Sequence, residues 1–349
     1  MSTNPVIVIG AGIVGASIAY HLSVHGADVT VIDAGLPGSG ATRHSFGWIG
    51  RSPGDSSPAG ELRALGLRHW ERLAREVPAL QVHWSGALVW GEDFGSLAPR
   101  DADAATLEPR LVEPPTAAEF RPGDGWVDPV RASESLIGAA RAHGASVRFG
   151  TPVTRLVTSR DGVVHGVQLG GEDLVASTVV VAAGVGSTAL CATAGVDLSM
   201  LSSPAIMVRL RASSGLVRGI VANDLFEARQ DVDGTVLMPL DYDQQISSED
   251  LWEVGEEALR LFTESFTGAD DATLVSAEIG WRPMMADGKP RVGSTGVPGL
   301  YAAVAHPGIT LAGVIGHAAA EEILTQTERT ELAAQRSPSG RRNQSLHPT

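Results

Sequence analysis

Cysteine and lysine are nearly absent from this chain of 349 residues, which contains only Cys191 and Lys289. A single cysteine cannot form an internal disulfide or a cysteine-based metal site, and it favours a reducing, cytoplasmic location. Lys289 lies in an Asp-Gly-Lys-Pro sequence, which is typical of a turn. A lysine is therefore available to catalysis at this one place only.

Positive charge and long apolar runs are also scarce. The formal net charge is −14 at pH 7, which favours solubility and argues against nucleic acid or an anionic membrane as a partner. No stretch of about 18 apolar residues occurs, so we expect no membrane span. The N-terminal segment has no basic region and is interrupted by glycines, which indicates a strand and a helix rather than a signal peptide.

The motifs of several enzyme classes are missing as well. The chain contains no His-Glu-x-x-His, Gly-x-Ser-x-Gly or Walker sequence, so metalloprotease, serine hydrolase and nucleotide triphosphatase functions have no support. His21 and His25 have the i, i+4 spacing of a helical metal site, but no third ligand is evident. We therefore expect a solvated helix face and no bound metal.

Glycine, by contrast, is abundant, with 41 residues in a sequence whose hydrophobic fraction of 43% is typical of a globular α/β protein. Val6–Ile9 and Val29–Ile32 are short apolar runs that predict buried parallel strands. Residues 13–25 between them have the length and the apolar stripe of a helix, which Gly26 would end. These segments predict a βαβ unit that ends at Asp33.

A glycine-rich sequence, Gly10-Ala11-Gly12-Ile13-Val14-Gly15, joins the first strand to this helix and matches the G-x-G-x-x-G fingerprint of dinucleotide-binding proteins. Its glycines permit a tight turn, a close approach to a pyrophosphate, and the packing of helix on strand. The helix N-terminus can bind phosphates, and Asp33, followed by Ala34, can bind a ribose. A glycine-rich turn without a ligand is the alternative, and the motif alone does not distinguish NAD from FAD.

Helical and strand patterns alternate along the rest of the chain. We expect helices at residues 61–76, 130–143, 250–266 and 310–324, and strands at residues 88–90, 146–149, 178–181, 277–281 and 300–304. Residues 153–158 and 163–169 predict a hairpin, and residues 205–211 and 235–239 alternate as in an antiparallel sheet. Residues 97–128 have no clean period, so we expect loops and one short helix there.

Three further segments resemble the family of FAD-dependent D-amino-acid oxidases, glycine oxidases and sarcosine oxidases. They are GSGATRHSFG at 38–47, the region from Asp128-Pro129 to Ala183-Gly184, and the region at 280–312 that contains GWRPMMADGKP and HPGITLA. The resemblance implies an α/β fold with a discontinuous, Rossmann-like FAD-binding domain at residues 1–85, 129–197 and 286–330. An α+β substrate domain with an antiparallel-rich sheet would occupy residues 86–128 and 198–285. We expect a disordered tail at residues 331–349.

The resemblance also implies where FAD is held. The Ala183-Gly184 turn would approach the cofactor by its backbone, Val153 would contact its adenine side, and a helix starting at Gly308 would aim its N-terminus at the flavin. An ordinary glycine-initiated helix is the alternative for Gly308. The residues expected to bind FAD are Gly10, Gly12, Ile13, Val14, Gly15, Asp33, Ala34, Gly40, Ala41, Thr42, His44, Ser45, Val153, Ala183, Gly184, Gly308, Ile309 and Thr310.

Two residues are candidates for substrate contact. Arg282 matches an arginine that binds the substrate carboxylate in glycine oxidase and D-amino-acid oxidase, and a guanidinium pairs with a carboxylate through two parallel hydrogen bonds. A structural salt bridge is the alternative. Tyr242 would face either the substrate or solvent. His44 matches a histidine that is bonded to flavin in some dimethylglycine and sarcosine dehydrogenases, and a nearby histidine without that bond is the alternative.

The chain departs from the sarcosine-oxidase branch in lacking its flavin-linked cysteine, in having Thr310 in place of a lysine, and in lacking a lysine in the substrate-domain sheet. These departures favour an electron carrier as the acceptor, with oxygen kept as the other candidate. We expect oxidation of the C–N bond of a small amino acid or N-methyl amino acid by hydride transfer to flavin N5, in a chain that can form a homo-oligomer. The alternatives are a 2-hydroxyacid dehydrogenase, which needs a basic histidine, and a flavin-binding subunit with little activity.

Overall fold

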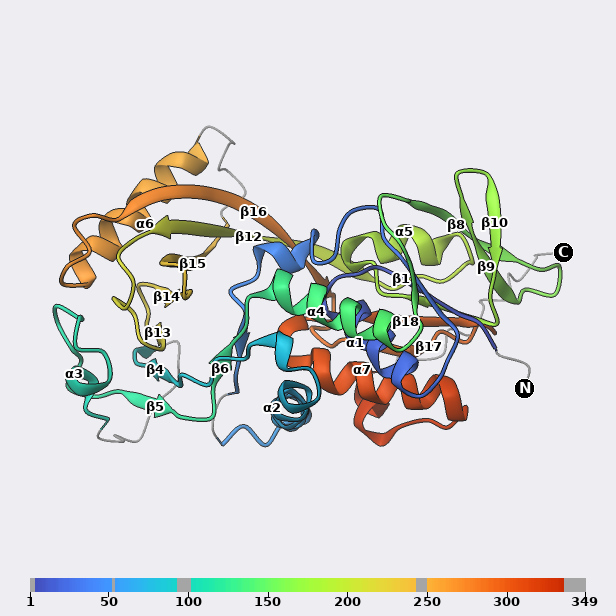
Figure 1. The fold of residues 1–349 in the computed structure, drawn as a ribbon, viewed down its shortest axis with the longest axis horizontal. Helices are drawn as coiled ribbons and strands as arrows, with labels where there is room; N and C mark the ends of the chain where they lie inside the picture. Colours follow the sequence, from blue (N-terminus) through green and yellow to red (C-terminus); the bar gives the residue numbers. More distant parts are fainter. Residues whose placement is uncertain (1–3, 52–53, 93–101, 243–249, 336–349) are drawn as a thin grey trace, which may run out of the picture.

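A six-stranded sheet with the strand order β17-β18-β11-β1-β2-β7 forms one half of the molecule in the computed structural model (Figure 1). The structure describes residues 4–51, 54–92, 102–242 and 250–335. The strands of this sheet are β1 (Val6–Ile9), β2 (Val29–Ile32), β7 (Ser146–Arg148), β11 (Thr178–Val181), β17 (Arg291–Ser294) and β18 (Leu300–Val304). All neighbouring strands are parallel except β17 and β18, so the sheet has the expected Rossmann-like core.

Alternate residues of β1 enter two different layers because successive side chains of a strand point to opposite faces. Val6 and Val8 pack against helices on one face, where α1 contacts both α4 and α7, and α2 contacts α7. Ile7 and Ile9 pack on the other face against the sheet β8-β9-β10 and α5. These elements are α1 (Ile13–Val24), α2 (Pro58–Glu76), α4 (Pro129–Ala142), α7 (Gly308–Thr325), α5 (Ser187–Ala192), β8 (Val153–Thr158), β9 (Val164–Leu169) and β10 (Glu172–Val175).

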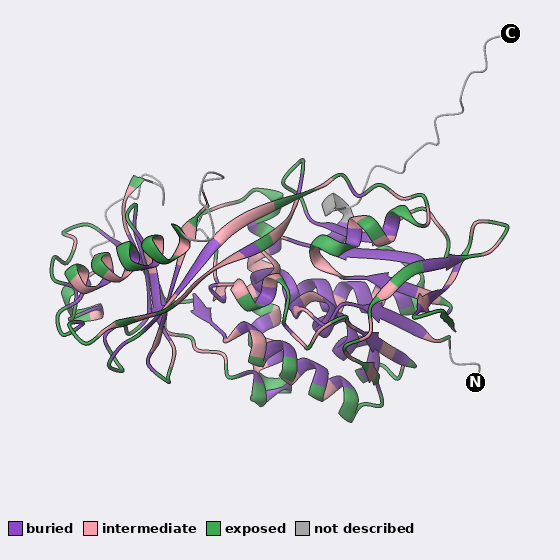
Figure 2. Ribbon diagram, turned by 90° about the horizontal axis from the view of Figure 1, so that it is seen from above, coloured by how far each residue is buried: buried purple, intermediate pink, exposed green. Residues whose placement is uncertain are grey.

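The second half contains a seven-stranded, mostly antiparallel sheet with the order β16-β12-β15-β14-β13-β4-β5. Its two longest strands, β12 and β16, extend toward the middle of the molecule, and α6 covers one face of the sheet (Figure 1). Figure 2 shows that the strands of the first sheet are largely buried, whereas the long strands β12 and β16 of the second sheet are mostly of intermediate or full exposure. The elements of this half are β4 (Ala87–Val89), α3 (Ala104–Leu107), β5 (Glu119–Arg121), β12 (Met200–Arg211), β13 (Ile220–Ala222), β14 (Glu227–Gln230), β15 (Thr235–Asp241), α6 (Asp250–Ser265) and β16 (Thr273–Met285).

Most of the predicted helices and strands lie within a few residues of their expected positions. Gly26 follows α1 with φ of 79°, the left-handed conformation that glycine adopts without strain. The sequence patterns did not indicate β5, β10, β13, β14 or β17, and β5 lies in the segment where only loops and a short helix were expected. Polar residues obscure the strand pattern in β10 and β14, and β13 is an apolar run of only three residues. Two further strands, β3 (Trp48–Ile49) and β6 (Gly125–Trp126), pair with each other between the two large sheets. No helix among the described ranges is long and apolar enough to cross a membrane.

The tail was expected to be disordered from residue 331, and the structure corrects its starting point. A short 3-10 helix spans Thr330–Gln335, and the Leu332 side chain is fully buried in the core around α1 and α7. A buried leucine gives this turn an apolar anchor, which the polar composition of the segment did not indicate. The rest of the predicted tail, at residues 336–349, and part of the predicted loop at 97–101 lie outside the described residues.

Candidate active site

A cavity of ≈ 880 Å³ lies where the two large sheets meet. Its volume is that of a site for a cofactor or a drug-sized ligand. Five connecting segments of the first half contribute to it, together with one face of the second sheet. The lining includes Gly10, Gly12, Ile13, Val14, Asp33, Ala34, Gly40, Ala41, Thr42, His44, Ser45, Phe46, Trp48, Val153, Ala183, Gly184, Ala205, Met207, Glu227, Pro239, Gly280, Trp281, Arg282, His306, Gly308 and Ile309.

The glycine-rich loop after β1 is shaped by contacts that exclude larger residues. Gly10 has φ of 108°, and a Cβ atom built on it would lie 2.3 Å from the carbonyl oxygen of Ala182. A Cβ on Gly15 would lie 2.0 Å from the carbonyl oxygen of Gly10, so Gly15 packs α1 on the loop and does not line the cavity. The N-cap residue Gly12 has no side chain to cap α1, but the hydroxyl of Thr42 accepts a hydrogen bond from the Ile13 N–H at 3.2 Å. The positive dipole end of α1 and its first residues, Ile13 and Val14, lie at the cavity.

Asp33 fixes the geometry of this loop from the end of β2. One carboxylate oxygen accepts a hydrogen bond from the backbone N–H of Ala11 at 2.6 Å, and the other accepts from the N–H of Gly35 at 2.7 Å. Each carboxylate oxygen has a second lone pair. Asp33 can therefore hold the loop and still accept a hydrogen bond from a hydroxyl group in the cavity.

A second helix N-terminus, that of α7, reaches the cavity next to the start of α1, since a Cβ atom on Gly308 would lie 3.8 Å from Cγ2 of Val14. Gly308 and Ile309 line the cavity, and no side chain caps this helix end. The indole N–H of Trp70 donates to the Ile309 carbonyl at 2.8 Å, which holds the first turn in place. Thr310 is buried behind the cavity wall, where its hydroxyl donates to the Trp48 carbonyl at 3.1 Å. Thr310 was expected to bind the cofactor, but it does not line the cavity and instead ties α7 to β3.

His44 belongs to the 40–48 segment and packs against β16. A Cβ atom on Gly280 would lie 2.5 Å from the Cβ of His44, so only glycine permits this contact. The His44 Nδ1 atom is 3.9 Å from Oε2 of Glu278. Burial lowers the pKa of His44, and the arginines nearby lower it as well, while Glu278 opposes them. The imidazole is therefore neutral at pH 7.

The guanidinium of Arg282 has N–H donors that no described protein group accepts from and that a ligand could use. Its Nη2 donates to the hydroxyl of Ser203 at 3.0 Å and to the carbonyl of Pro204 at 3.2 Å, both on the neighbouring strand β12. Its Nε is buried and has no hydrogen-bond partner. Arg282 makes no salt bridge with any described residue, so the alternative of a structural ion pair is not what the structure shows. An unpaired buried donor costs free energy unless a ligand satisfies it.

Arg229 holds the Phe46–Trp48 wall of the cavity in position. Its fully buried guanidinium donates to the Phe46 and Val127 carbonyls, pairs with Asp231 at 2.8 Å, and lies 4.3 Å from the ring centroid of Trp126. Burial lowers the pKa of Arg229, and Asp231 opposes this effect. The 40–48 segment is thereby attached to β14.

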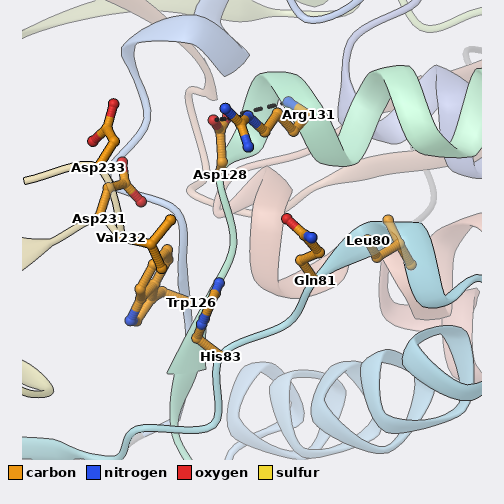
Figure 3. Close-up of a pocket in the computed structure, with 9 residues that line it drawn as sticks. All are labelled: Leu80, Gln81, His83, Trp126, Asp128, Arg131, Asp231, Val232 and Asp233. Atoms are coloured by element: carbon orange, nitrogen blue, oxygen red, sulfur yellow. Dashed lines mark hydrogen bonds and ion pairs between the residues drawn. The ribbon is translucent and has the colours of Figure 1, made fainter. Parts of the chain in front are cut away.

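A smaller pocket of ≈ 40 Å³ lies beside this arginine (Figure 3). Figure 3 shows Trp126 and His83 side by side, with Asp231 on one side and the Asp128–Arg131 ion pair above. The two rings stack with centroids 4.0 Å apart. The pocket has room for a few waters only. It is therefore no candidate for the binding of a cofactor or substrate.

Two titratable cavity residues had no role in the sequence-based hypothesis. Burial, and then the positive charges of Arg282 and Arg63, lower the pKa of His306 to about 4. Burial, and then the negative charge of Asp241, raise the pKa of Glu227 to about 7. His306 is therefore neutral at pH 7, whereas the pKa of Glu227 lies in the neutral range. A charged residue at an inward position of a strand would have indicated a functional role for Glu227, but β14 itself was not predicted.

The structure does not bring Tyr242 to the cavity. Tyr242 follows β15 and packs against the core between the second sheet and α6, on the side opposite to the cavity-lining Pro239. Lys289 is exposed in its turn and also does not line the cavity. The other residues expected to bind cofactor or substrate, apart from Gly15 and Thr310, all line it.

The histidines of α1 form no metal site in the part of the chain that the structure describes. His21 is buried rather than solvated, because its ring contacts that of His317, with centroids 5.5 Å apart. The ring of His69 lies 4.9 Å from that of His317. Burial lowers the pKa of each of these three histidines, which therefore form a neutral cluster between α1, α2 and α7.

Comparisons with known proteins agree with this architecture. The family model described as FAD dependent oxidoreductase (DAO) matches residues 5–322. The glycine oxidase of Geobacillus kaustophilus is 26% identical over 95% of this chain and 95% of its own length. The crystal structure of glycine oxidase from this species superposes with a TM-score of 0.81 over 96% of this chain and 98% of that chain. The 4-methylaminobutanoate oxidase (formaldehyde-forming) of Paenarthrobacter nicotinovorans is 29% identical over 60% of this chain and 28% of its own length.

Proposed function

The chain belongs to the family of FAD dependent oxidoreductases (DAO), and on this premise we propose that it oxidises the C–N bond of a small amino acid or N-methyl amino acid. It is an enzyme that uses FAD. The observation that carries the proposed substrate class is the buried, unpaired Nε of Arg282 at the wall of the cavity. Glycine oxidase and 4-methylaminobutanoate oxidase, as the names of two relatives, support a substrate with a carboxylate and an amino group.

The cavity fits FAD in both its size and its chemistry. The β1–α1 loop leaves no space for a side chain at Gly10, and the positive dipole end of α1 suits a pyrophosphate. Cβ atoms on Gly40 and Gly184 would meet no protein atom within 4 Å, so the backbone at these positions is open to a ligand. We assign the pyrophosphate to Gly10, Gly12 and the start of α1, and a ribose to Asp33.

The remaining cavity residues would surround the flavin end of the cofactor. Bound FAD supplies the acceptor for a hydride from the substrate carbon. The uncapped N-terminus of α7, at Gly308 and Ile309, would stabilise negative charge at the ring edge by its dipole and its N–H groups. His44 would lie near the flavin without a covalent bond. Acid precipitation of the protein tests this assignment, since a yellow pellet would show a covalent link and a colourless pellet its absence.

Arg282 would hold the carboxylate of the substrate. Its contacts to Ser203 and Pro204 fix one end of the guanidinium, and its Nε remains free to donate to a carboxylate oxygen. An anchored guanidinium orients the substrate without losing side-chain freedom at the moment of binding. Arg282 therefore serves as a positioning group that aligns the α-carbon with the cofactor.

The amine would react in its deprotonated form, so that no side-chain base is required. The pKa of about 4 makes His306 a weak base, and its neutral imidazole adds no charge next to the substrate amine. A 2-hydroxyacid dehydrogenase needs a histidine that is basic enough to take the hydroxyl proton. The low pKa of His306 therefore favours an amine over a hydroxy acid as the substrate.

Product analysis tests the proposal. Purified enzyme loaded with FAD is incubated with a panel of amino acids, N-methyl amino acids and 2-hydroxy acids, either in air or with an artificial electron acceptor without oxygen. We expect a 2-oxo acid or an aldehyde together with ammonia or a methylated amine. Turnover of hydroxy acids alone would favour the alternative dehydrogenase, and no turnover would favour a flavin-binding subunit. The arm with oxygen distinguishes an oxidase from a dehydrogenase.

A further inference from the structure

Glu227, the first residue of β14, is a carboxylate that lines the cavity without a hydrogen bond or an ion pair from any residue that the structure describes. The charged group that affects Glu227 most is Asp241 on the adjacent strand β15, whose carboxylate repels that of Glu227. A partly buried carboxylate without a partner is unfavourable. A cationic group of a ligand would relieve both the desolvation and the repulsion.

Glu227 and Arg282 lie on the same face of the seven-stranded sheet. Arg229 pairs with Leu237, so Glu227, two residues earlier, aligns with Pro239. Pro239 pairs with Met207, and Met207 pairs with Glu278 on β16. Residues directly opposite each other share a face, and so do residues an even number apart along a strand. Arg282 is four residues after Glu278 and therefore faces the cavity together with Glu227.

The two charges are too far apart to bind the two polar groups of one simple α-amino acid. Three strand intervals of about 4.8 Å and four residues of about 3.3 Å place the Cα atoms of Glu227 and Arg282 about 20 Å apart on a flat sheet. The long side chains shorten this gap but do not close it. In an α-amino acid, a single carbon atom separates the amino group from the carboxylate. Glu227 would therefore meet a group farther along the substrate.

The surface between the two charges is mostly apolar, although Asp241, which pairs with Ala205, lies on the same face. Ala205, Met207 and Pro239 lie on the cavity face of β12 and β15, between Glu227 on β14 and Arg282 on β16. Such a floor suits a chain of methylene groups. The site thus offers a cation for a carboxylate, an apolar strip, and an anion at the far end.

We propose that Glu227 determines specificity by binding a second, cationic group at the distal end of the substrate whose carboxylate Arg282 holds. The proposal rests on the proposed function and narrows the substrate class to amino acids or N-methyl amino acids with a basic side chain. Glu227 acts on recognition and is not placed at the reacting atoms.

Matched substrate pairs test the proposal. Arginine and citrulline differ by one charge at nearly constant shape, and lysine and norleucine differ by the terminal ammonium group. We expect kcat/KM to be at least tenfold higher for the cationic member of at least one pair, in one enantiomer or its N-methyl form. Glu227→Gln should reduce this ratio to near one, mainly through KM, and Glu227→Asp should restore part of it. Asp241→Asn, which removes the neighbouring carboxylate, should retain the preference.

A pH profile adds a readout that a merely structural role of Glu227 would not produce. The pKa of Glu227 is raised to about 7, with Asp241 on β15 as its charged neighbour. The preference for the cationic substrate should therefore increase between pH 6 and pH 8 in the wild type. The increase should be absent in Glu227→Gln, whose amide does not titrate in this range.

Binding of compounds that cannot be oxidised separates recognition from turnover. Isothermal titration calorimetry is performed on the holoenzyme with 6-(trimethylammonio)hexanoate and with its isostere 7,7-dimethyloctanoate, whose distal end is uncharged. We expect at least tenfold tighter binding of the cationic compound by the wild type, and a ratio near one for Glu227→Gln. Equal binding of the two compounds by the wild type would overturn the proposal.

The outcomes distinguish this proposal from the proposed function. Turnover of glycine or norleucine that equals or exceeds turnover of the basic amino acids would overturn the role of Glu227 and leave the amino acid oxidoreductase intact. Turnover of no amino acid, with the charge preference retained in calorimetry, would overturn the proposed reaction and support Glu227 as a cation-binding residue. Loss of the preference in both Glu227→Gln and Asp241→Asn would show a general effect of negative charge and contradict a specific contact.

Discussion

The guanidinium of Arg282 is fixed by the hydroxyl of Ser203, with 3.0 Å between Nη2 and Oγ, while its own Nε stays buried without a partner. One end of the side chain is therefore positioned by the protein, and the other end awaits a ligand. Ser203 therefore orients the guanidinium on β16. Arg282 itself would make the contact with the substrate.

Arg282→Met should reduce kcat/KM for the amino acid substrate about 10- to 100-fold, because hydrogen bonds to a charged group contribute about 1.5–3 kcal/mol each. Ser203→Ala keeps the guanidinium and removes only its anchor, so we expect a loss of a few fold. Steady-state kinetics measure both effects, and the FAD content of each variant serves as the control. Equal losses in the two variants would contradict a direct contact of Arg282 with the carboxylate.

The β1–α1 loop should not tolerate a side chain at its first glycine. Gly10→Ala places a Cβ atom 2.3 Å from the Ala182 carbonyl at a residue whose φ is 108°, so the loop must shift and FAD retention should fall. Gly138→Ala, in the middle of α4 with nothing within 4 Å, is the matched control and should stabilise the protein by up to about 1 kcal/mol. The absorbance ratio of bound flavin to protein and thermal unfolding measure these effects. Normal FAD content in Gly10→Ala would contradict the assigned site.

Two Arg–Asp pairs of the second sheet should differ sharply in their effect on stability. Arg229 is fully buried and pairs with Asp231, whereas the side chains of Arg211 and Asp233 are 52% and 57% exposed. Arg229→Met should lower the free energy of unfolding by about 3–5 kcal/mol, because it leaves buried acceptors without a donor. Arg211→Met should change it by about 0–1 kcal/mol. Chemical denaturation of both variants tests this difference, which similar losses would contradict.

The histidine cluster between α1, α2 and α7 should destabilise the fold in mild acid. Burial, and then His317 and Arg72, lower the pKa of His69 to about 4, and the pKa of His21 is also well below its usual value of 6.5. The unfolded chain therefore binds more protons than the folded chain between about pH 6.5 and pH 4, and stability falls as the pH decreases through this window.

His69→Gln should make the pH dependence of unfolding shallower, because it removes one of the protons that are taken up on unfolding. His165→Gln, on the surface hairpin away from the cluster, is the matched control and should keep the slope of the wild type. Urea denaturation at several pH values between 4 and 7 gives the slopes. Parallel curves for His69→Gln and the wild type would contradict the linkage.

Local sequence signals predicted the cofactor half well. The fingerprint at Gly10–Gly15, the strands around it and the helix that begins at Gly308 are each encoded within about 20 residues by the hydrophobic period and the glycines. The orientation of Arg282 was not predictable in detail, because its anchor comes from Ser203 on a strand distant in sequence. The expectation that Arg282 contacts the substrate came from the resemblance to a family and not from the sequence pattern.

The positions that differ from the expected ones have a common physical origin in non-local pairing. Tyr242 follows a correctly predicted strand, but the alternation of side chains along β15 directs it to the core beside α6. Thr310 is in the right helix, yet its hydroxyl is bonded to Trp48, which lies 262 residues away. Glu227 lies on a short strand, Glu-Ala-Arg-Gln, whose polar composition hides the alternation, so its cavity position depends on its register with β15.

The most direct measurement of the central claim is the anaerobic reduction of bound flavin by an amino acid and by the 2-hydroxy acid of the same carbon skeleton. Both ligands carry the carboxylate that Arg282 would hold, so they differ only in the bond to be oxidised. We predict that the amino acid bleaches the flavin absorbance of the wild type, that the hydroxy acid does not, and that bleaching is strongly slowed in Arg282→Met. Bleaching by the hydroxy acid alone, or by no member of a broad panel of amino acids, would contradict the account.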